Sequence, residues 1–220
     1  MEWSWFPVQL SLIVATIATF ITLLCGVIIA HVMVTKRFKG KAFVETVIFL
    51  PLVLPPTVIG FLLIMVFGKN SPIGNMIEWV TGRSVLFTST AAVIAATVVA
   101  FPLMYQSVKT GMLSVDRNVI GAAKVDGATS WKLLILITLP LSLRSLITGV
   151  ILSFTRGFGE FGATLMFAGN IPGSTQTIPT AIYLALETGH TGIAWNYVVI
   201  SIVFSFFLLF SINRTKGMLQ

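Results

Sequence analysis

Long apolar stretches separated by short charged clusters dominate the chain. Five stretches without a charged residue cover 3–35, 46–68, 84–108, 161–186 and 188–213. Each is long enough to supply the ~20 residues that an α-helix needs to cross a bilayer. The pattern therefore predicts an all-α fold, a polytopic bundle of about five membrane-spanning helices.

Turn-forming residues shift the fourth predicted span. The sequence Gly-Asn-Ile-Pro-Gly-Ser at 169–174 would expose irregular backbone to lipid if it lay at membrane depth. The fourth span is better placed upstream of this turn, although it then carries Arg144, Arg156 and Glu160. The predicted spans are 9–35, 43–67, 87–108, 141–167 and 195–213.

Two short helices are predicted outside the spans. In the segment 69–86, Ser71 can cap a helix that has Pro72 at its first position and Gly82 as its stop. The segment 175–187 repeats this design behind Thr177. Both segments are predicted to lie at the outer membrane surface.

Composition agrees with a membrane protein and excludes an ordinary soluble enzyme. Of the 220 residues, 56% are hydrophobic and only 10% are charged, whereas soluble domains carry roughly a quarter charged residues. We interpret residues 1–220 as one membrane domain whose first apolar stretch is a retained membrane anchor. The single cysteine, Cys25, lies in an apolar run and predicts no disulfide.

The net charge of +7 indicates orientation rather than nucleic-acid binding. Eleven Lys and Arg fall on one side of the five predicted spans and two, Lys69 and Arg83, on the other. Basic loops are usually retained in the cytoplasm. We therefore expect a multi-pass protein of the bacterial or archaeal cytoplasmic membrane, with its N-terminus outside and its C-terminus in the cytoplasm.

The segment 109–140 is the largest predicted cytoplasmic loop. Ser114 or Asp116 can cap a helix that reaches about Val125 and stops at Gly127, and a second short helix can begin near Ser130. From these signals alone, an ordinary connector between two spans is favoured over a compact projection for a soluble partner.

A spaced set of residues in this loop resembles the EAA motif of the permease subunits of ABC importers. The motif reads E-A-A, three residues, G, nine residues, I, one residue, L-P. Six of its seven fixed positions match: Ala122, Ala123, Gly127, Ile137, Leu139 and Pro140. The departure is Gly121, where the family usually has glutamate, so a contact made by that carboxylate is not expected here.

This resemblance implies that the 109–140 loop forms coupling helices that dock into cytoplasmic ATP-binding subunits. Small residues at 122, 123 and 127 allow close approach, and Trp131 offers an apolar anchor of the kind that dominates interfaces. The chain contains no G-x-x-x-x-G-K-[ST] sequence, so ATP hydrolysis is expected on a separate subunit. The chain itself is expected to be a transport component without catalytic residues.

Further segments resemble molybdate permease subunits over about 8–213. These are the Leu-Pro-Pro sequence at 54–56, Arg-Gly-Phe-Gly-Glu-Phe-Gly-Ala-Thr at 156–164, and Thr-Ile-Pro-Thr-Ala-Ile-Tyr at 177–183. The resemblance implies a type I ABC importer fold, a homodimer, two ATP-binding subunits and an extracytoplasmic oxyanion-binding protein, with no cofactor. Sulfate permeases share some of these elements, but the Leu-Pro-Pro and Thr-Ile-Pro segments and the short length favour molybdate. The resemblance therefore implies the permease subunit of an ATP-driven molybdate importer, with tungstate, which is chemically close to molybdate, and sulfate as the alternative substrates.

The same segments supply the candidate residues for a translocation path or gate: Pro55, Pro56, Arg156, Glu160 and Thr164. The prolines predict either a packing kink or a bent helix beside the path. Arg156 and Glu160 are four residues apart, so they can pair on one face of a helix. Their pairing could fix a subunit interface or line a gate, since charges at membrane depth face the bundle interior or water.

Other function classes find less support in the sequence. A secondary transporter typically has inverted repeats and intramembrane acidic sites, and only Glu160 offers the latter. An intramembrane enzyme needs a catalytic constellation or metal ligands at membrane depth, and His31 and His190 lack suitably spaced partners. The glycines at 157–162 spell G-x-G-x-x-G but follow no predicted strand, so a dinucleotide site is excluded.

Overall fold

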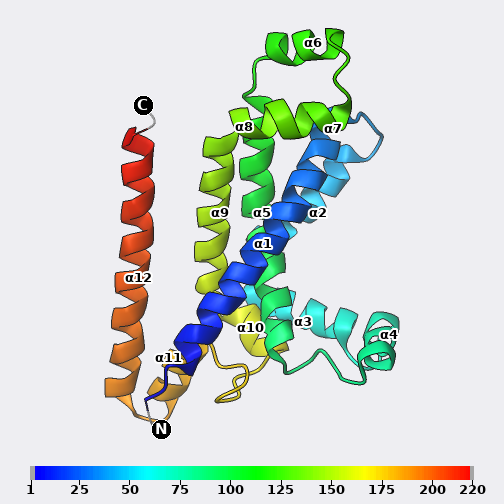
Figure 1. Cartoon of the computed structure of the whole chain (residues 1–220). Helices are drawn as coiled ribbons and strands as arrows, with labels where there is room; N and C mark the ends of the chain where they lie inside the picture. The colour runs from blue at the N-terminus through cyan, green and yellow to red at the C-terminus, as the bar shows by residue number, and fades with distance from the viewer. Residues whose placement is uncertain (1–2, 219–220) are drawn as a thin grey trace.

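The computed structural model of the chain describes residues 3–218, and all regular structure in that range is helical (Figure 1). The helices are α1 (Phe6–Thr35), α2 (Lys41–Val53), α3 (Pro56–Phe67), α4 (Pro72–Thr81), α5 (Ser89–Leu113), α6 (Arg117–Val125), α7 (Ser130–Leu133), the π-helical turn η1 (Leu134–Thr138), α8 (Leu139–Leu141), α9 (Leu143–Phe158), α10 (Gly162–Phe167), α11 (Ile178–Glu187) and α12 (Thr191–Met218).

Three of the described helices, α1, α5 and α12, are each long and apolar enough to cross a membrane unbroken. Two further spans are bent pairs: α2 with α3 at 118°, and the 130–141 segment with α9 at 78°. If each bent pair crosses once, the described chain has up to five spans. The N-terminal and C-terminal ends lie at opposite ends of the bundle, as an odd number of crossings requires (Figure 1).

The predicted second span, 43–67, is wrong as one helix. Pro51 lies inside α2 without ending it, but the chain is extended at Leu54 and Pro55 before α3 begins at Pro56. A proline ring disfavours helical backbone at the residue before it, and two consecutive prolines enforce the break. The chain therefore bends by 118° between α2 and α3.

The predicted fourth span, 141–167, is also interrupted. Helix α9 ends at Phe158, and residues 159–161 turn the chain before the short α10 begins at Gly162. Smaller differences affect the ends of the other spans, since α1 begins at Phe6, α5 continues to Leu113 and α12 begins at Thr191.

Small residues form the seam between α5 and α9. A Cβ atom on Gly111 would lie 2.6 Å from the Cβ of Ser145, and one on Gly149 would lie 2.8 Å from the Cβ of Ser107. Alanines of α1 and α5 are buried in the same bundle. Because lipid tails are as apolar as leucine, close backbone approach and van der Waals packing hold membrane helices together. The α1–α5–α9 core follows from this use of small residues.

The two short helices α3 and α10 pack tightly against each other. A Cβ atom on Gly60 would lie 2.6 Å from the Cβ of Met166 and 3.2 Å from the Ala163 backbone. A Cβ on Gly162 would lie 2.8 Å from the Cβ of Pro56. Since Pro56 and Gly162 each begin a helix that follows a break, the breaks of the second and fourth spans lie side by side.

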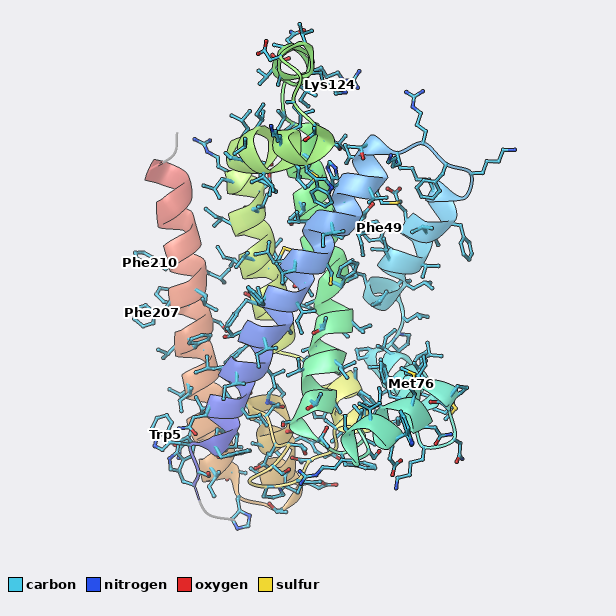
Figure 2. The ribbon with its side chains drawn as sticks, turned by 45° about the vertical axis from the view of Figure 1, so that its right-hand side comes forward. Trp5, Phe49, Met76, Lys124, Phe207 and Phe210 are labelled. Atoms are coloured by element: carbon cyan, nitrogen blue, oxygen red, sulfur yellow. The ribbon has the colours of Figure 1, made fainter. Side chains whose placement is uncertain are left out.

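Helix α12 stands at the margin of the bundle (Figure 1). It is joined to the N-terminal segment by Tyr197, whose hydroxyl donates to the Ser4 carbonyl oxygen at 2.8 Å and whose ring lies 4.6 Å from that of Trp3. Figure 2 shows Phe207 and Phe210 pointing away from the other helices. This apolar outer face suits contact with lipid.

The predicted short helices outside the spans are confirmed as α4 and α11. Ser71 Oγ accepts the Gly74 N–H at 2.8 Å, which caps α4, and Gly82 ends the helix with a positive φ of 69°. At the start of α11, the Thr177 N–H donates to Thr180 Oγ1 at 2.8 Å. These ends form where local capping signals predict them.

Candidate coupling and translocation sites

Within the segment 109–140, helix α6 extends beyond the end of the bundle, and α7, η1 and α8 lie across that end (Figure 1). Asp116 Oδ1 accepts the Asn118 N–H at 2.8 Å and caps α6. At the other end, Gly127 adopts a φ of 82°, and the Ala128 N–H donates to the Ala123 carbonyl oxygen at 2.9 Å. This closure satisfies carbonyl groups that a helix end leaves free. Both ends of helix α6 are therefore fixed by hydrogen bonds.

The small residues of the motif lie on and next to α6, with open space beside them. Ala122 is exposed and Ala123 half-buried, and a Cβ atom on Gly121 or Gly127 would meet nothing within 4 Å. Val125 is 89% exposed at the same end of α6. The backbone conformation at Gly127, rather than packing within this chain, therefore requires a glycine. The surface around Gly127 is free for a partner.

Trp131 lies on α7, the second helical segment of this loop, and is 58% exposed. Its ring is 5.7 Å from that of His31, near the end of α1, and His31 Nε2 lies 3.1 Å from Ser130 Oγ. No sequence signal connects His31 with Ser130, which lies 99 positions later. The contact joins α1 directly to the second coupling segment.

The last part of the motif occupies a π-helical turn and the helix after it. Ile137 lies in η1, and Leu139 and Pro140 form the start of α8. A π turn accommodates a proline that can neither donate a hydrogen bond nor approach the carbonyl four residues earlier. Ile137 and Leu139 are half-buried, so this part of the motif connects the projecting loop to α9 instead of presenting a surface.

Arg156 and Glu160 form the ion pair that their spacing predicts. Arg156 Nη1 lies 2.6 Å from Glu160 Oε2, and Glu160 Oε1 accepts the Ala163 N–H at 2.8 Å. Glu160 lies beyond the end of α9, so the expectation that both residues share one helix is wrong. The buried carboxylate instead ties the end of α9 to the start of α10. Because the side chain of Arg156 is 31% exposed, its charge still reaches the surface of the chain.

The other predicted path residues gather near this ion pair. Pro55 and Pro56 are exposed at the start of α3, and Thr164 is buried in α10, which packs on α3. The packing of Gly162 on Pro56 brings the two groups together. The path candidates therefore converge where the two broken spans meet, at the opposite end of the bundle from α6 (Figure 1).

A second polar cluster was missed by the sequence reasoning. Glu45 Oε1 on α2 accepts hydrogen bonds from Lys109 Nζ and, at 3.0 Å, from the Tyr105 hydroxyl, both on α5. Both side chains of the Glu45–Lys109 ion pair are only about a quarter exposed. Phe49 packs on Tyr105 one turn along α2, with 5.9 Å between ring centroids. The cluster holds α2, which has no fully buried residue, against the bundle.

Breaking this ion pair is expected to destabilise the folded protein. Glu45→Gln and Lys109→Gln should each lower the free energy of unfolding by about 1 kcal/mol, the order of magnitude that a partly exposed ion pair contributes. The charge swap E45K/K109E should restore at least half of the lost stability. Unfolding of the detergent-purified protein measures this, and a swap that is no more stable than the single variants would contradict a pairing role.

Comparison with known proteins places the chain among transport proteins. Residues 9–214 match the family model "Binding-protein-dependent transport system inner membrane component". The chain is 55% identical over 210 residues to the "Putative molybdenum transport system permease protein YvgM" of Bacillus subtilis, covering 96% of this chain and 92% of that protein. It is 42% identical over 192 residues to the "Molybdenum transport system permease protein ModB" of Escherichia coli, covering 86% and 84%.

Solved structures agree on the fold. A bacterial alginate ABC transporter, crystallised with its alginate-bound periplasmic protein, matches with a TM-score of 0.77 at 17% identity, covering 100% of this chain and 80% of that chain. The MetNI methionine ABC transporter in an inward-facing conformation matches with a TM-score of 0.69 at 16% identity, covering 98% and 94%. The predicted ABC importer permease fold is confirmed. This chain belongs to the family of inner-membrane components of binding-protein-dependent transport systems, whose members are transport subunits and not catalysts.

Proposed function

We propose that this chain is the permease subunit of an ATP-driven importer for molybdate. The observation that carries the proposal is the 55% and 42% identity, over most of the chain, to permeases named for molybdenum transport. A second candidate substrate is sulfate, because the chain is also 35% identical over 223 residues to the "Probable sulfate transport system permease protein cysT" of Chlorokybus atmophyticus.

The permease works as a homodimer in this proposal. Pro55, Pro56 and Arg156 are partly or fully exposed on the single chain. A second copy placed against this surface would enclose a path between the two α3–α10 pairs. The path then contains a cation already paired with Glu160, which suits passage of a dianion better than a bare positive ring that would trap it.

Energy reaches the path through α6 and α7. Two cytoplasmic ATP-binding subunits bind the loop at 109–140 of the two permease copies, with Ala122, Ala123, Gly127 and Trp131 at the contact. Ile137, Leu139 and Pro140 transmit the movement to α9. The ion pair of Arg156 with Glu160 links α9 to α10, so the chain offers a continuous mechanical connection from α6 to the path. An extracytoplasmic binding protein delivers the oxyanion at the other end.

Uptake competition tests the substrate. The permease is reconstituted with its ATPase and its binding protein, and entry of labelled molybdate is measured against an excess of unlabelled molybdate, tungstate or sulfate. Molybdate and tungstate should compete and sulfate should not, because sulfate is smaller. Competition by sulfate at equal concentration would instead identify a sulfate permease.

The proposed orientation places the loop at 109–140 in the cytoplasm. In a Cys25→Ser background, cysteine at Thr129 should react with a membrane-impermeant maleimide only after the cells are opened. Thr129 is exposed at the start of α7, so its reactivity reports the side of the membrane rather than burial. A cysteine at Lys69, at the other end of the bundle, is the matched control and should react in intact cells or spheroplasts. The reverse pattern would invert the topology.

A further inference from the structure

The short connection between α1 and α2 carries a dense positive charge. Lys36, Arg37 and Lys39 are exposed and Lys41 is half-buried, so four cations fall within six residues. None of the four forms an ion pair with another described residue. The nearest carboxylate in the sequence, Glu45, is already bound by Lys109. We name residues 36–41 the basic loop.

The basic loop carries only positive charge, whereas the loop at 109–140 carries charges of both signs. On and around α6, Arg117 and Lys124 are flanked by Asp116 and Asp126. Such mixed charge suits a protein surface that carries both signs. The basic loop contains no acidic residue, so its complement is a surface of uniform negative charge.

The position of the basic loop and its exposed phenylalanines indicate that the negatively charged surface it binds is the membrane. The basic loop joins the ends of two helices of the membrane bundle and lies near the level of α7, while α6 extends beyond it (Figure 1). Phe38 and Phe43, 42% and 72% exposed, lie within and directly after the loop. Cations interspersed with exposed aromatic rings are typical of segments that lie at the headgroup boundary. Gly40, with a φ of 90°, turns the loop back toward α2.

We propose that the basic loop binds the headgroups of anionic phospholipids, such as phosphatidylglycerol. Lys36, Arg37 and Lys39 contact the phosphodiester groups, and Phe38 and Phe43 insert between lipid chains. Each basic residue near an anionic leaflet adds to the attraction, so several together select anionic over zwitterionic lipid. His31, which contacts Ser130, lies one turn before the loop, so the lipid binds where α1 meets the second coupling segment.

Lipid retention on the purified importer complex tests this site. The complex is transferred to nanodiscs that contain equal amounts of phosphatidylcholine and phosphatidylglycerol, and co-purifying lipids are counted by native mass spectrometry. The variant K36Q/R37Q/K39Q/K41Q should lose the preference for phosphatidylglycerol by at least about tenfold. The control K69Q/R83Q/R144Q removes positive charges elsewhere, outside α6 and α7, and should keep the preference. An unchanged preference in the first variant would overturn the proposal. If the first variant instead lost the ATPase subunit but kept its lipid preference, the basic loop would be a protein contact and the proposal would also be wrong.

If the four-fold variant does not insert into the membrane, a lipid cross-linking measurement on the wild-type complex tests the site instead. Photoactivatable phosphatidylglycerol is added to the wild-type complex, and the cross-linked peptides are identified. Cross-links should concentrate on residues 36–43 and disappear with excess unlabelled phosphatidylglycerol but not with phosphatidylcholine. Cross-links spread evenly over the lipid-facing helices, or absent from 36–43, would overturn the site.

Discussion

Replacing Gly127 with valine is expected to reduce ATP-driven uptake by about tenfold while leaving the permease folded in the membrane. Gly127 has a φ of 82°, a left-handed conformation that costs an L-residue roughly 1–2 kcal/mol and a β-branched residue more. The strain would open the closure between Ala128 and Ala123 and displace the end of α6. Uptake and ATP hydrolysis are measured together, and the ratio of substrate moved to ATP consumed should fall.

Gly127→Asn is the matched control, because asparagine tolerates this conformation better than any residue except glycine. It should retain most of the uptake. If G127V transports as well as the wild type, α6 does not need its defined end and the proposed coupling role is wrong.

Replacing Glu160 is expected to have the largest effect on the path. Glu160→Gln keeps an oxygen that accepts the Ala163 N–H but leaves Arg156 without its carboxylate. Removing one partner of a fully buried pair costs roughly 3–5 kcal/mol; since Arg156 is partly exposed, we expect about 2 kcal/mol here. The thermal midpoint of the detergent-purified permease should fall, and uptake should drop by at least tenfold.

Comparing Glu160→Ala with Glu160→Gln distinguishes the two interactions of this carboxylate, the ion pair and the hydrogen bond. E160A removes the cap of α10 as well as the ion pair and should lower stability by about 1 kcal/mol more than E160Q. Arg156→Gln removes the cation and leaves a buried carboxylate, so it should be at least as damaging as E160Q. Wild-type stability and uptake in E160Q would show that the pair holds neither the α9–α10 corner nor the path.

Local signals in the sequence predicted the helix ends and the projecting loop. Ser71 with Pro72, Thr177, and Asp116 with Gly127 each place a cap or a stop where the structure has one. Such features depend on a few neighbouring residues, so they can be read without knowledge of the tertiary fold. The three unbroken spans follow in the same way from uninterrupted apolar length.

Contacts between distant residues could not be predicted in this way. Glu45 and Lys109 are 64 positions apart, and each looks like an ordinary charge at the end of a span. Their partnership becomes visible only when α2 lies on α5. The break at 159–161 was missed for a related reason, because glycine is common within membrane helices and does not by itself predict an end. Here the break depends on the buried Glu160 capping the next helix.

The central claim is that this chain moves its substrate only when an ATPase acts on the loop at 109–140. Its most direct test is entry of molybdate into proteoliposomes that contain the permease, with its binding protein on the outside and its ATPase subunits on the inside. Entry should require the ATPase and hydrolysable ATP, and it should stop with a non-hydrolysable analogue. Entry at the same rate without the ATPase, or driven by an ion gradient alone, would contradict the account.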